Sequence, residues 1–142
     1  MSAEPIITFH KVRKAFGQTV VFRNLTLDVY AGETMVVMGG SGVGKSVMLK
    51  MLIRLLDPDR GVIRFHGKEV TAMEGEDLRH LRQNICMLFQ GAALFDSMSV
   101  RDNVAYALNE HFRDEMSEAE IDERVDWALT LVDLPGIEAM MP

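Results

Sequence analysis

The residues best suited to chemistry stand in one glycine-rich segment with the pattern G-x-x-x-x-G-K-S. Glycines allow the backbone to wrap closely around an anion, and the N–H groups of the loop and of a following helical turn then point at it. Lys45 adds a positive charge for the β- and γ-phosphates of a nucleotide, and the hydroxyl of Ser46 is a ligand for Mg²⁺. The segment therefore predicts a site for nucleotide phosphates. Its residues are Gly39, Gly40, Ser41, Gly42, Val43, Gly44, Lys45 and Ser46.

This motif requires a strand before it and a helix after it. The apolar run Thr34 to Met38 predicts a buried strand, and the residues from about Ser46 to Leu56 predict a helix that ends before Asp57-Pro58-Asp59-Arg60-Gly61. A glycine-rich turn followed by a chance Lys-Ser pair is the alternative. The order of strand, loop and helix argues against it.

Alternating apolar residues predict two antiparallel strands upstream of the loop, at Ile6 to Val12 and Val20 to Tyr30. Downstream, a short strand from Val62 to His66 precedes a Gly67-Lys68 turn, and a polar helix is expected around residues 76–82.

A second buried strand is expected from Asn84 to Phe89, which places Gln90 at its end. The single cysteine, Cys86, lies in this run and is expected to be a buried structural thiol.

Two helices are expected near the C-terminal end. One starts at Ser99 and continues through Leu108, and the other follows a capping box from Ser117 to Glu120. Asp133 follows Leu129 to Val132, a stretch that superficially fits the pattern of four apolar residues and an aspartate at the end of a strand. Because the period is helical and Leu134 follows, Asp133 is expected to end a helix. The apolar stripe of that helix is Ile121, Val125, Ala128, Leu129 and Val132.

Composition limits the classes of function. The chain has 142 residues, of which 48% are hydrophobic, so it can bury the core of a domain. Its formal net charge of −6 and the lack of a basic groove argue against a nucleic-acid partner. The apolar runs are shorter than the ~20 residues that span a bilayer, and the N-terminus has no signal pattern, so a cytoplasmic chain is expected.

Several motifs together resemble the nucleotide-binding subunit of an ABC transporter, over essentially the whole chain. They are the phosphate loop, Lys14-Ala15-Phe16-Gly17, Leu55-Leu56-Asp57-Pro58-Asp59-Arg60-Gly61, Gln90 with the residues after it, and Ser99 to Leu108. The amino-acid sequence from Met87 to Val100 is most similar to that of the bacterial lipid-transport ATPases of the Mla or toluene-tolerance type.

The resemblance implies an α/β fold with a P-loop NTPase core, an antiparallel β subdomain and a helical subdomain. It places the nucleotide-binding core and β subdomain at residues 1–89, and the loop glutamine with an incomplete helical subdomain at 90–142. It implies ATP and Mg²⁺ as ligands and Lys45 and Gln90 as catalytic residues. Phe16 would stack on adenine, and Gln90 would reach Mg²⁺ and the attacking water. From the residues alone, Phe16 could instead be a core or turn aromatic, and Gln90 a polar cap on a strand end.

The same resemblance implies two partners, a transmembrane permease subunit and a second ATP-binding subunit in a homodimer, and a location on the inner face of the plasma membrane. Phe95 and Tyr106 would dock the permease, although packing inside a helical subdomain is the alternative for both.

The sequence departs from the family after Leu134, where the last residues resemble the approach to an L-S-G-G signature. The signature, the Walker B aspartate, the catalytic glutamate and the switch histidine are not in the sequence. The expectation is a chain truncated before the signature motif, without turnover alone and with unpaired apolar strand edges. A nucleotide-binding module without turnover is the alternative. A GTPase or a small-molecule kinase is a third possibility, since both share the phosphate loop, and the GTPase is disfavoured because no Asn-Lys-x-Asp motif occurs.

Overall fold

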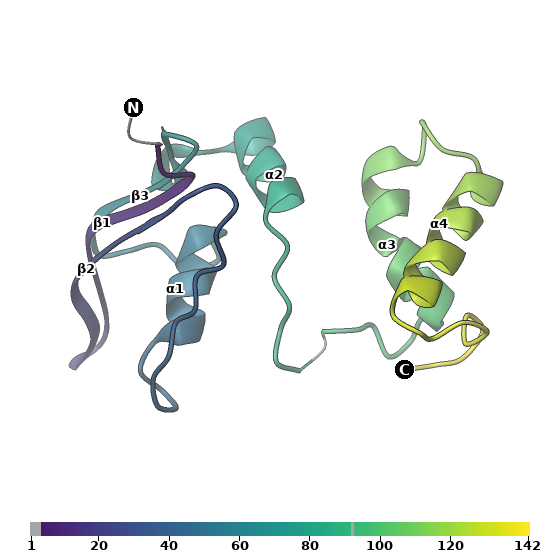
Figure 1. Ribbon diagram of the computed structural model, residues 1–142, viewed down its shortest axis with the longest axis horizontal. Helices are drawn as coiled ribbons and strands as arrows, with labels where there is room; N and C mark the ends of the chain where they lie inside the picture. Colours follow the sequence, from purple (N-terminus) through teal and green to yellow (C-terminus); the bar gives the residue numbers. More distant parts are fainter. Residues whose placement is uncertain (1–3, 92) are drawn as a thin grey trace. The chain divides into compact units, whose positions relative to one another are not determined.

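The computed structural model describes residues 4–91 and 93–142; Ala92, in the segment that resembles the transporter family, lies outside them. The chain divides into two compact units, of which the first ends at Met87 and the second runs from Leu88 to Pro142. The first contains all the strands that the described residues form, together with helices, and the second is a pair of helices (Figure 1).

The sheet of the first unit has four antiparallel strands in the order β2-β1-β3-β4. The long hairpin of β1 (Ile7–Phe16) and β2 (Thr19–Val29) confirms the prediction of two antiparallel strands. β3 (Arg60–Phe65) pairs with the other edge of β1, and β4 is the short strand Lys68–Glu69. His66 and Gly67 both have positive φ, which suits the tight β3–β4 turn.

Helix α1 (Lys45–Leu52) follows the glycine-rich loop and ends four residues earlier than the sequence predicts. Arg54 adopts a left-handed conformation at φ 53°, and the N–H of Leu55 donates to the carbonyl of Lys50 at 2.8 Å. These contacts form a Schellman turn, which stops the helix. The short helix η1 (Val70–Ala72) and helix α2 (Gly75–Asn84) complete the unit, so the helix predicted around 76–82 is confirmed.

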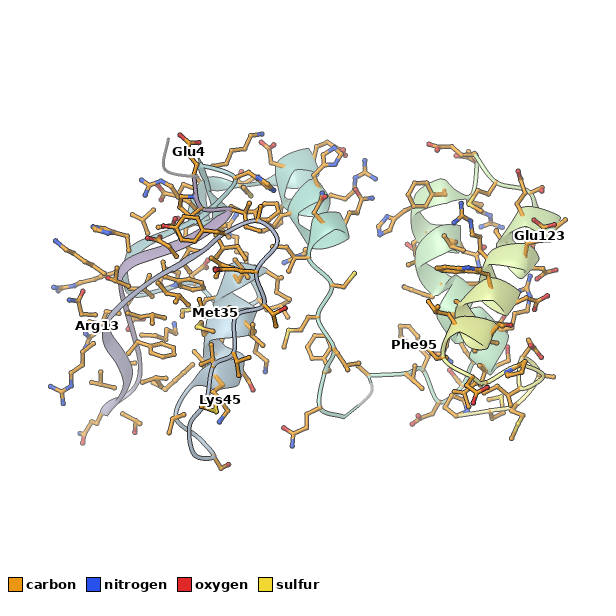
Figure 2. The ribbon with its side chains drawn as sticks, in the orientation of Figure 1. Glu4, Arg13, Met35, Lys45, Phe95 and Glu123 are labelled. Atoms are coloured by element: carbon orange, nitrogen blue, oxygen red, sulfur yellow. The ribbon has the colours of Figure 1, made fainter. Side chains whose placement is uncertain are left out.

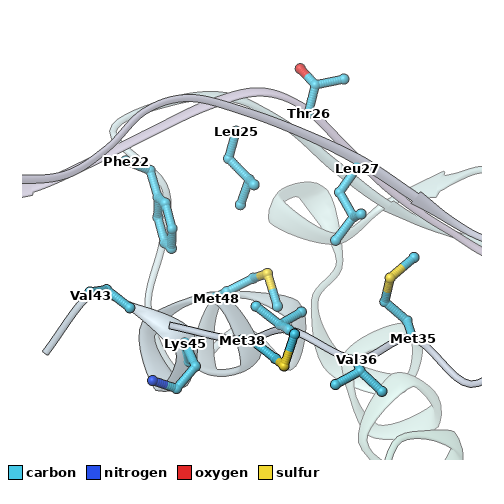
Figure 3. Close-up of a pocket in the computed structure, with 11 residues that line it drawn as sticks. Phe22, Leu25, Thr26, Leu27, Met35, Val36, Met38, Val43, Lys45 and Met48 are labelled. Atoms are coloured by element: carbon cyan, nitrogen blue, oxygen red, sulfur yellow. The ribbon is translucent and has the colours of Figure 1, made fainter. Parts of the chain in front are cut away.

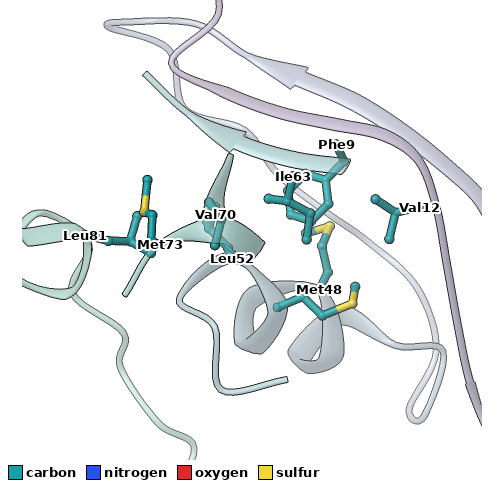
Figure 4. Packing of buried hydrophobic residues seen from close by; sticks show 9 residues of the cluster. Phe9, Val12, Met48, Leu52, Ile63, Val70, Met73 and Leu81 are labelled. Carbon is teal, nitrogen blue, oxygen red and sulfur yellow. The ribbon is translucent and has the colours of Figure 1, made fainter. Parts of the chain in front are cut away.

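The core of the first unit lies between the sheet and α1 (Figure 4). Each fully buried aliphatic or aromatic side chain contributes about 1.5–3 kcal/mol relative to an exposed one, so this cluster fixes α1, and with it the loop, against the sheet. The buried members are Phe9, Val12, Met48, Met51, Leu52, Ile63, Val70, Met73 and Leu81.

Two predicted buried strands are wrong in this structure. Neither residues 34–38 nor residues 84–89 pair with another strand among the described residues: Asn84 is the last residue of α2, and Val36, Met38 and Leu88 are 70%, 88% and 92% exposed. A strand is defined by its hydrogen-bonded neighbour, and an apolar run without one stays an extended segment. Cys86 lies in the second segment and is exposed, so the prediction of a buried thiol is wrong as well.

The second unit consists of α3 (Val100–Phe112) and α4 (Glu118–Leu131). Both predicted starts are confirmed, because the Ser99 side chain accepts a hydrogen bond from the N–H of Asp102 and Ser117 forms a capping box with Glu120. The predicted stripe of α4 is largely confirmed, with Ile121, Val125 and Leu129 buried in the cluster between the two helices and Ala128 half-buried.

Val132 is the exception, because it lies at the C-cap of α4 and is 61% exposed. Asp133 follows it in a left-handed conformation, at φ 60°, which confirms Asp133 as a helix end. None of the helices within residues 4–91 and 93–142 has the length and apolar character of a membrane span.

Candidate nucleotide-binding site

The glycine-rich loop leads directly into α1, as the motif requires. Gly44 is the N-cap of the helix at φ 107°, a left-handed backbone that side chains rarely adopt. A Cβ at this position would lie 2.4 Å from Cγ1 of Val21 and 2.8 Å from Cζ of Phe22. Position 44 therefore requires glycine for two reasons, the left-handed backbone conformation and the close approach of β2.

The first turn of α1 presents donors to an anion. The first helical hydrogen bond runs from the N–H of Met48 to the carbonyl of Gly44 at 2.9 Å, which leaves the N–H groups of Lys45, Ser46 and Val47 outside the helical ladder. Within the described chain, this turn has no side-chain cap and no acidic residue. The positive end of the helix dipole and these donors together favour a phosphate group.

Lys45 is the first residue of α1 (Figure 2). Its side chain folds back over the loop. Its Nζ donates to the carbonyl of Gly39 at 2.6 Å and to that of Gly40 at 2.7 Å. An ammonium group has three N–H donors, so the side chain can hold the loop closed and can exchange these carbonyls for phosphate oxygens. The predicted charge is thus present at the loop.

A cavity of about 390 Å³ lies beside the loop, between β2, the extended segment 35–38 and α1 (Figure 3). Its wall is apolar except for Thr26 and Lys45, so it suits apolar side chains better than phosphates. The backbone N–H groups suited to an anion therefore lie at the loop and the start of α1, beside this cavity and not in its apolar wall. The lining residues are Phe22, Leu25, Thr26, Leu27, Met35, Val36, Val37, Met38, Val43, Lys45 and Met48.

Phe16 lies at the tip of the β1–β2 hairpin, opposite Thr19, and is 47% exposed. The structure therefore does not place it in the core, while a turn aromatic and a base-stacking residue both remain consistent with its position. Nζ of Lys14 lies over the ring, 5.3 Å from its centroid.

Asp59 ties the turn after α1 to β1, close to Phe16. One carboxylate oxygen accepts from the N–H of Ala15 at 2.7 Å and from Arg13 at 3.2 Å, and the other accepts from Lys14 at 3.3 Å. Desolvation raises the pKa of Asp59, but these hydrogen bonds and the two positive charges outweigh it and hold the pKa below its ordinary value.

Sequence reasoning missed both Lys14 and Asp59. Lys14 could have been found, because residues two apart in a strand share a face and Lys14 is two before Phe16. Asp59 gave no such signal, since its partners are 44 to 46 residues away in the sequence.

Gln90 belongs to the second unit, is exposed, and follows an extended segment instead of the expected strand. Its role at the metal and the attacking water stays a prediction from the sequence. Within the described residues, no group of three or more His, Cys, Asp or Glu side chains could hold a metal ion. Oxygen donors such as the hydroxyl of Ser46 and the amide of Gln90 have the chemistry that Mg²⁺ prefers.

The loop before α3 carries Phe95, whose ring lies 4.8 Å from that of Tyr106, centroid to centroid. Both side chains are partly exposed, at 45% and 39%, and lie outside the buried cluster between α3 and α4. Asn103 fixes this loop, since its amide donates to the carbonyls of Phe95, Met98 and Ser99 and accepts from the N–H of Phe95 at 2.8 Å.

Arg101 links the two helices of the second unit. Its guanidinium donates to Asp122 at 2.7 Å and to Glu118 at 3.0 Å, both on α4. The hydrogen bond to Asp122 and, to a smaller extent, the hydrogen bond to Glu118 raise the pKa of Arg101 above its ordinary value. The residue is thus a permanent positive link between α3 and α4.

Solved structures share this fold. The chain is similar to the dimeric structure of MJ0796, a bacterial ABC transporter cassette, with a TM-score of 0.84 and 26% identity over 94% of this chain and 60% of that one. A post-hydrolysis structure of the MJ0796 cassette, bound to ADP and Pi, has a TM-score of 0.85 at 25% identity, over 96% of this chain and 61% of that one. These likenesses confirm the expected α/β fold class.

Three curated relatives are similar to this chain in sequence. The chain is 43% identical to the probable ribonucleotide transport ATP-binding protein mkl of Mycobacterium leprae, over 91% of this chain and 37% of that protein. It is 39% identical to the chloroplastic protein TRIGALACTOSYLDIACYLGLYCEROL 3 of Arabidopsis thaliana, over 99% of this chain and 40% of that protein. It is 35% identical to the intermembrane phospholipid transport system ATP-binding protein MlaF of Escherichia coli K12, over 99% of this chain and 52% of that protein.

The chain thus spans between 37% and 52% of the length of these three relatives. The family described as ABC transporter matches residues 22–141, which include the phosphate loop, α1 and the second unit up to its last residue but one. The resemblance drawn from the phosphate loop and the segments around it is confirmed, and the chain belongs to the ABC transporter family.

Proposed function

We propose that this chain forms the Mg·ATP-binding part of the energy-coupling ATPase of an ABC transporter for a lipid or another hydrophobic substrate. The observation that carries the proposal is the loop from Gly39 to Ser46, which enters α1 through Gly44 with Lys45 held beside it. This is an arrangement of donors and positive charge suited to the phosphates of a nucleotide.

Each residue has a role in this proposal. The N–H groups of the loop and of the first turn of α1 hold the phosphates, and Lys45 exchanges its two loop carbonyls for phosphate oxygens. The Ser46 hydroxyl and the Gln90 amide are the residues that would hold Mg²⁺, which supplies charge neutralisation on the phosphates when bound. Gln90 also orients the attacking water, and Phe16 stacks on the adenine.

Two partners follow from the family. A permease subunit crosses the membrane and receives the energy of ATP, with Phe95 and Tyr106 as the contact we propose. A second ATP-binding subunit forms a homodimer, in keeping with the dimeric cassette structures that this chain resembles. The chain would then lie in the cytoplasm, on the inner face of the plasma membrane.

The names of two relatives, MlaF and TRIGALACTOSYLDIACYLGLYCEROL 3, support a lipid substrate. A ribonucleotide is the second candidate, because the relative from Mycobacterium leprae carries that name. Stimulation of ATP hydrolysis in the reconstituted transporter would separate the two. Phospholipid in the bilayer should raise the rate, whereas added ribonucleoside should leave it unchanged.

Titration calorimetry with Mg·ATP tests the proposed site directly. Replacing Lys45 by Ala should weaken binding about ten- to a hundred-fold, the range for loss of a charged hydrogen bond. Lys50→Ala is the matched control, because it removes the same charge from the last turn of α1 and should bind as the wild type does. Equal affinity of the wild type and Lys45→Ala would contradict the assignment of the loop.

A further inference from the structure

The proposed base-stacking residue, Phe16, is the end of a contact network that begins on a different element. Asp59, in the turn between α1 and β3, accepts a hydrogen bond from the N–H of Ala15, the residue before Phe16, at 2.7 Å. This bond fixes the backbone next to the ring. The side chain of Asp59 is only 31% exposed, so the contact is partly sheltered from solvent.

Lys14 is the second part of the network. Its Nζ donates to the carbonyl of Asp57 at 2.7 Å and to the carboxylate of Asp59 at 3.3 Å, and the side chain is 14% exposed. The same Nζ lies 5.3 Å from the centroid of the Phe16 ring. Because these hydrogen bonds fix the ammonium group of Lys14, a cation covers one face of the Phe16 ring.

Gly61 allows the two elements to approach so closely. A Cβ at this position would lie 2.4 Å from the carbonyl oxygen of Lys11 and 2.6 Å from the Cα of Val12. The start of β3 therefore packs directly on the backbone of β1, which places Asp59 within reach of residues 13 to 15. The network is built into the sheet and does not depend on flexible surface side chains alone.

We propose that Asp59 and Lys14 are positioning residues for the nucleotide base: Asp59 holds Lys14 and the backbone at Ala15, and Lys14 covers one face of Phe16, so the ring presents its other face to adenine. A ring fixed before binding loses less conformational freedom when the base arrives. The cation also draws π-electron density toward itself, which makes the opposite face a better partner for an electron-rich purine. This inference rests on the stacking role proposed for Phe16.

The test compares two ligands that differ in the base. Affinities for Mg·ATP and for inorganic triphosphate with Mg²⁺ are measured on the purified protein by calorimetry, and their ratio reports the contribution of the base. Lys14→Met and Asp59→Asn should each weaken ATP binding about fivefold, part of the loss expected for a stacked base. Triphosphate binding should stay within about twofold of the wild type, because its contacts lie at the loop.

Matched variants control for charge and for folding. Lys68→Met removes the same charge from β4, where Lys68 pairs with Asp77. This variant should have the wild-type ratio of Mg·ATP affinity to triphosphate affinity. Asp57→Asn alters the same turn at a carboxylate that pairs with Arg54, and should keep it too. Lys14→Arg retains a cation beside the ring and should restore the ratio that Lys14→Met loses.

The outcomes distinguish the positioning role of Asp59 and Lys14 from the stacking role of Phe16. If Phe16→Ala lowers the ratio while Lys14→Met and Asp59→Asn lower only the melting temperature, the network is structural and the inference is overturned. If Phe16→Ala also leaves the ratio unchanged, the stacking role fails and the inference fails with it, whereas the phosphate loop would still be tested by Lys45→Ala. A lowered ratio in all three, restored by Lys14→Arg, supports the inference.

Discussion

Lys45 and Phe16 would contribute to nucleotide binding through different forces. Lys45 acts through charge, which salt screens, and it already contacts two carbonyls that phosphate oxygens would replace. Phe16 acts through the flat surface of its ring, which is 47% exposed at the hairpin tip and carries no charge. The two contributions should therefore be separable by salt and by ligand.

The first prediction concerns Phe16. Replacement by Ala should weaken ATP binding by about 1–3 kcal/mol, the range for an aromatic side chain stacked on a base, whereas Phe16→Tyr keeps the ring and should bind nearly as the wild type does. Because the side chain is half exposed, the melting temperature should hardly change. Normal ATP binding by Phe16→Ala would instead identify a turn aromatic.

Single residues of the loop could be predicted from the sequence because the motif is contiguous and each residue type has a stated use. The role of Asp59 could not, since it depends on contacts across 44 to 46 residues that only the folded sheet creates. Lys14 is different, because it is two residues before Phe16 in the same strand and its position beside that ring could have been predicted. The prediction that Cys86 is buried was wrong for a related reason. Apolar neighbours in the sequence do not bury a side chain unless another element covers it.

At the scale of elements, α1 depends on the glycine that starts it. Gly44→Ala should destabilise the protein by several kcal/mol, because Cβ would meet Val21 and Phe22 and the φ of 107° is strained for alanine. Gly40→Ala is the matched control, since its Cβ would lie 3.9 Å from Val43 in ordinary contact. Urea unfolding should show a large loss for the first variant and a small one for the second, and equal losses would refute this account.

The start of α4 offers a smaller and more local test. Ser117 accepts a hydrogen bond from the N–H of Glu120 and completes a capping box. Ser117→Ala should reduce the free energy of unfolding by about 1 kcal/mol, while Ser117→Asp, which also caps, should lose little. Amide hydrogen exchange of Glu118 to Ile121 measures how stable the first turn of α4 is. Exchange should be faster in Ser117→Ala than in the wild type, and close to the wild type in Ser117→Asp. Unchanged exchange rates in Ser117→Ala would show that the cap contributes nothing.

Elements with local signals were predicted well, and those that need distant partners were not. Helices α3 and α4 begin where their capping residues indicate, and the β1–β2 hairpin follows from alternation within neighbouring residues. Residues 34–38 and 85–89 have the apolar composition of strands but find no partner among the described residues. Composition specifies that such a run should be covered, and it does not supply the strand that covers it.

At the scale of the whole molecule, the segment 35–38 exposes apolar side chains on the first unit. It forms one wall of the apolar cavity of about 390 Å³ beside the phosphate loop. Val36 and Met38 are 70% and 88% exposed, and the backbone of the segment has no strand neighbour within the described residues. Such a surface favours pairing with another chain.

The last prediction is that the 142-residue chain, expressed by itself, self-associates through this segment. Light scattering should show a mass that grows with protein concentration, because extended apolar segments pair between copies. Val36→Lys should reduce the association by placing a charge on the pairing surface. Val132→Lys is the matched control, since Val132 is 61% exposed but lies at the helical end of α4, and it should associate as the wild type does. A wild-type chain that stays monomeric and melts sharply would contradict the prediction, because its apolar wall would then be tolerated in water without a partner.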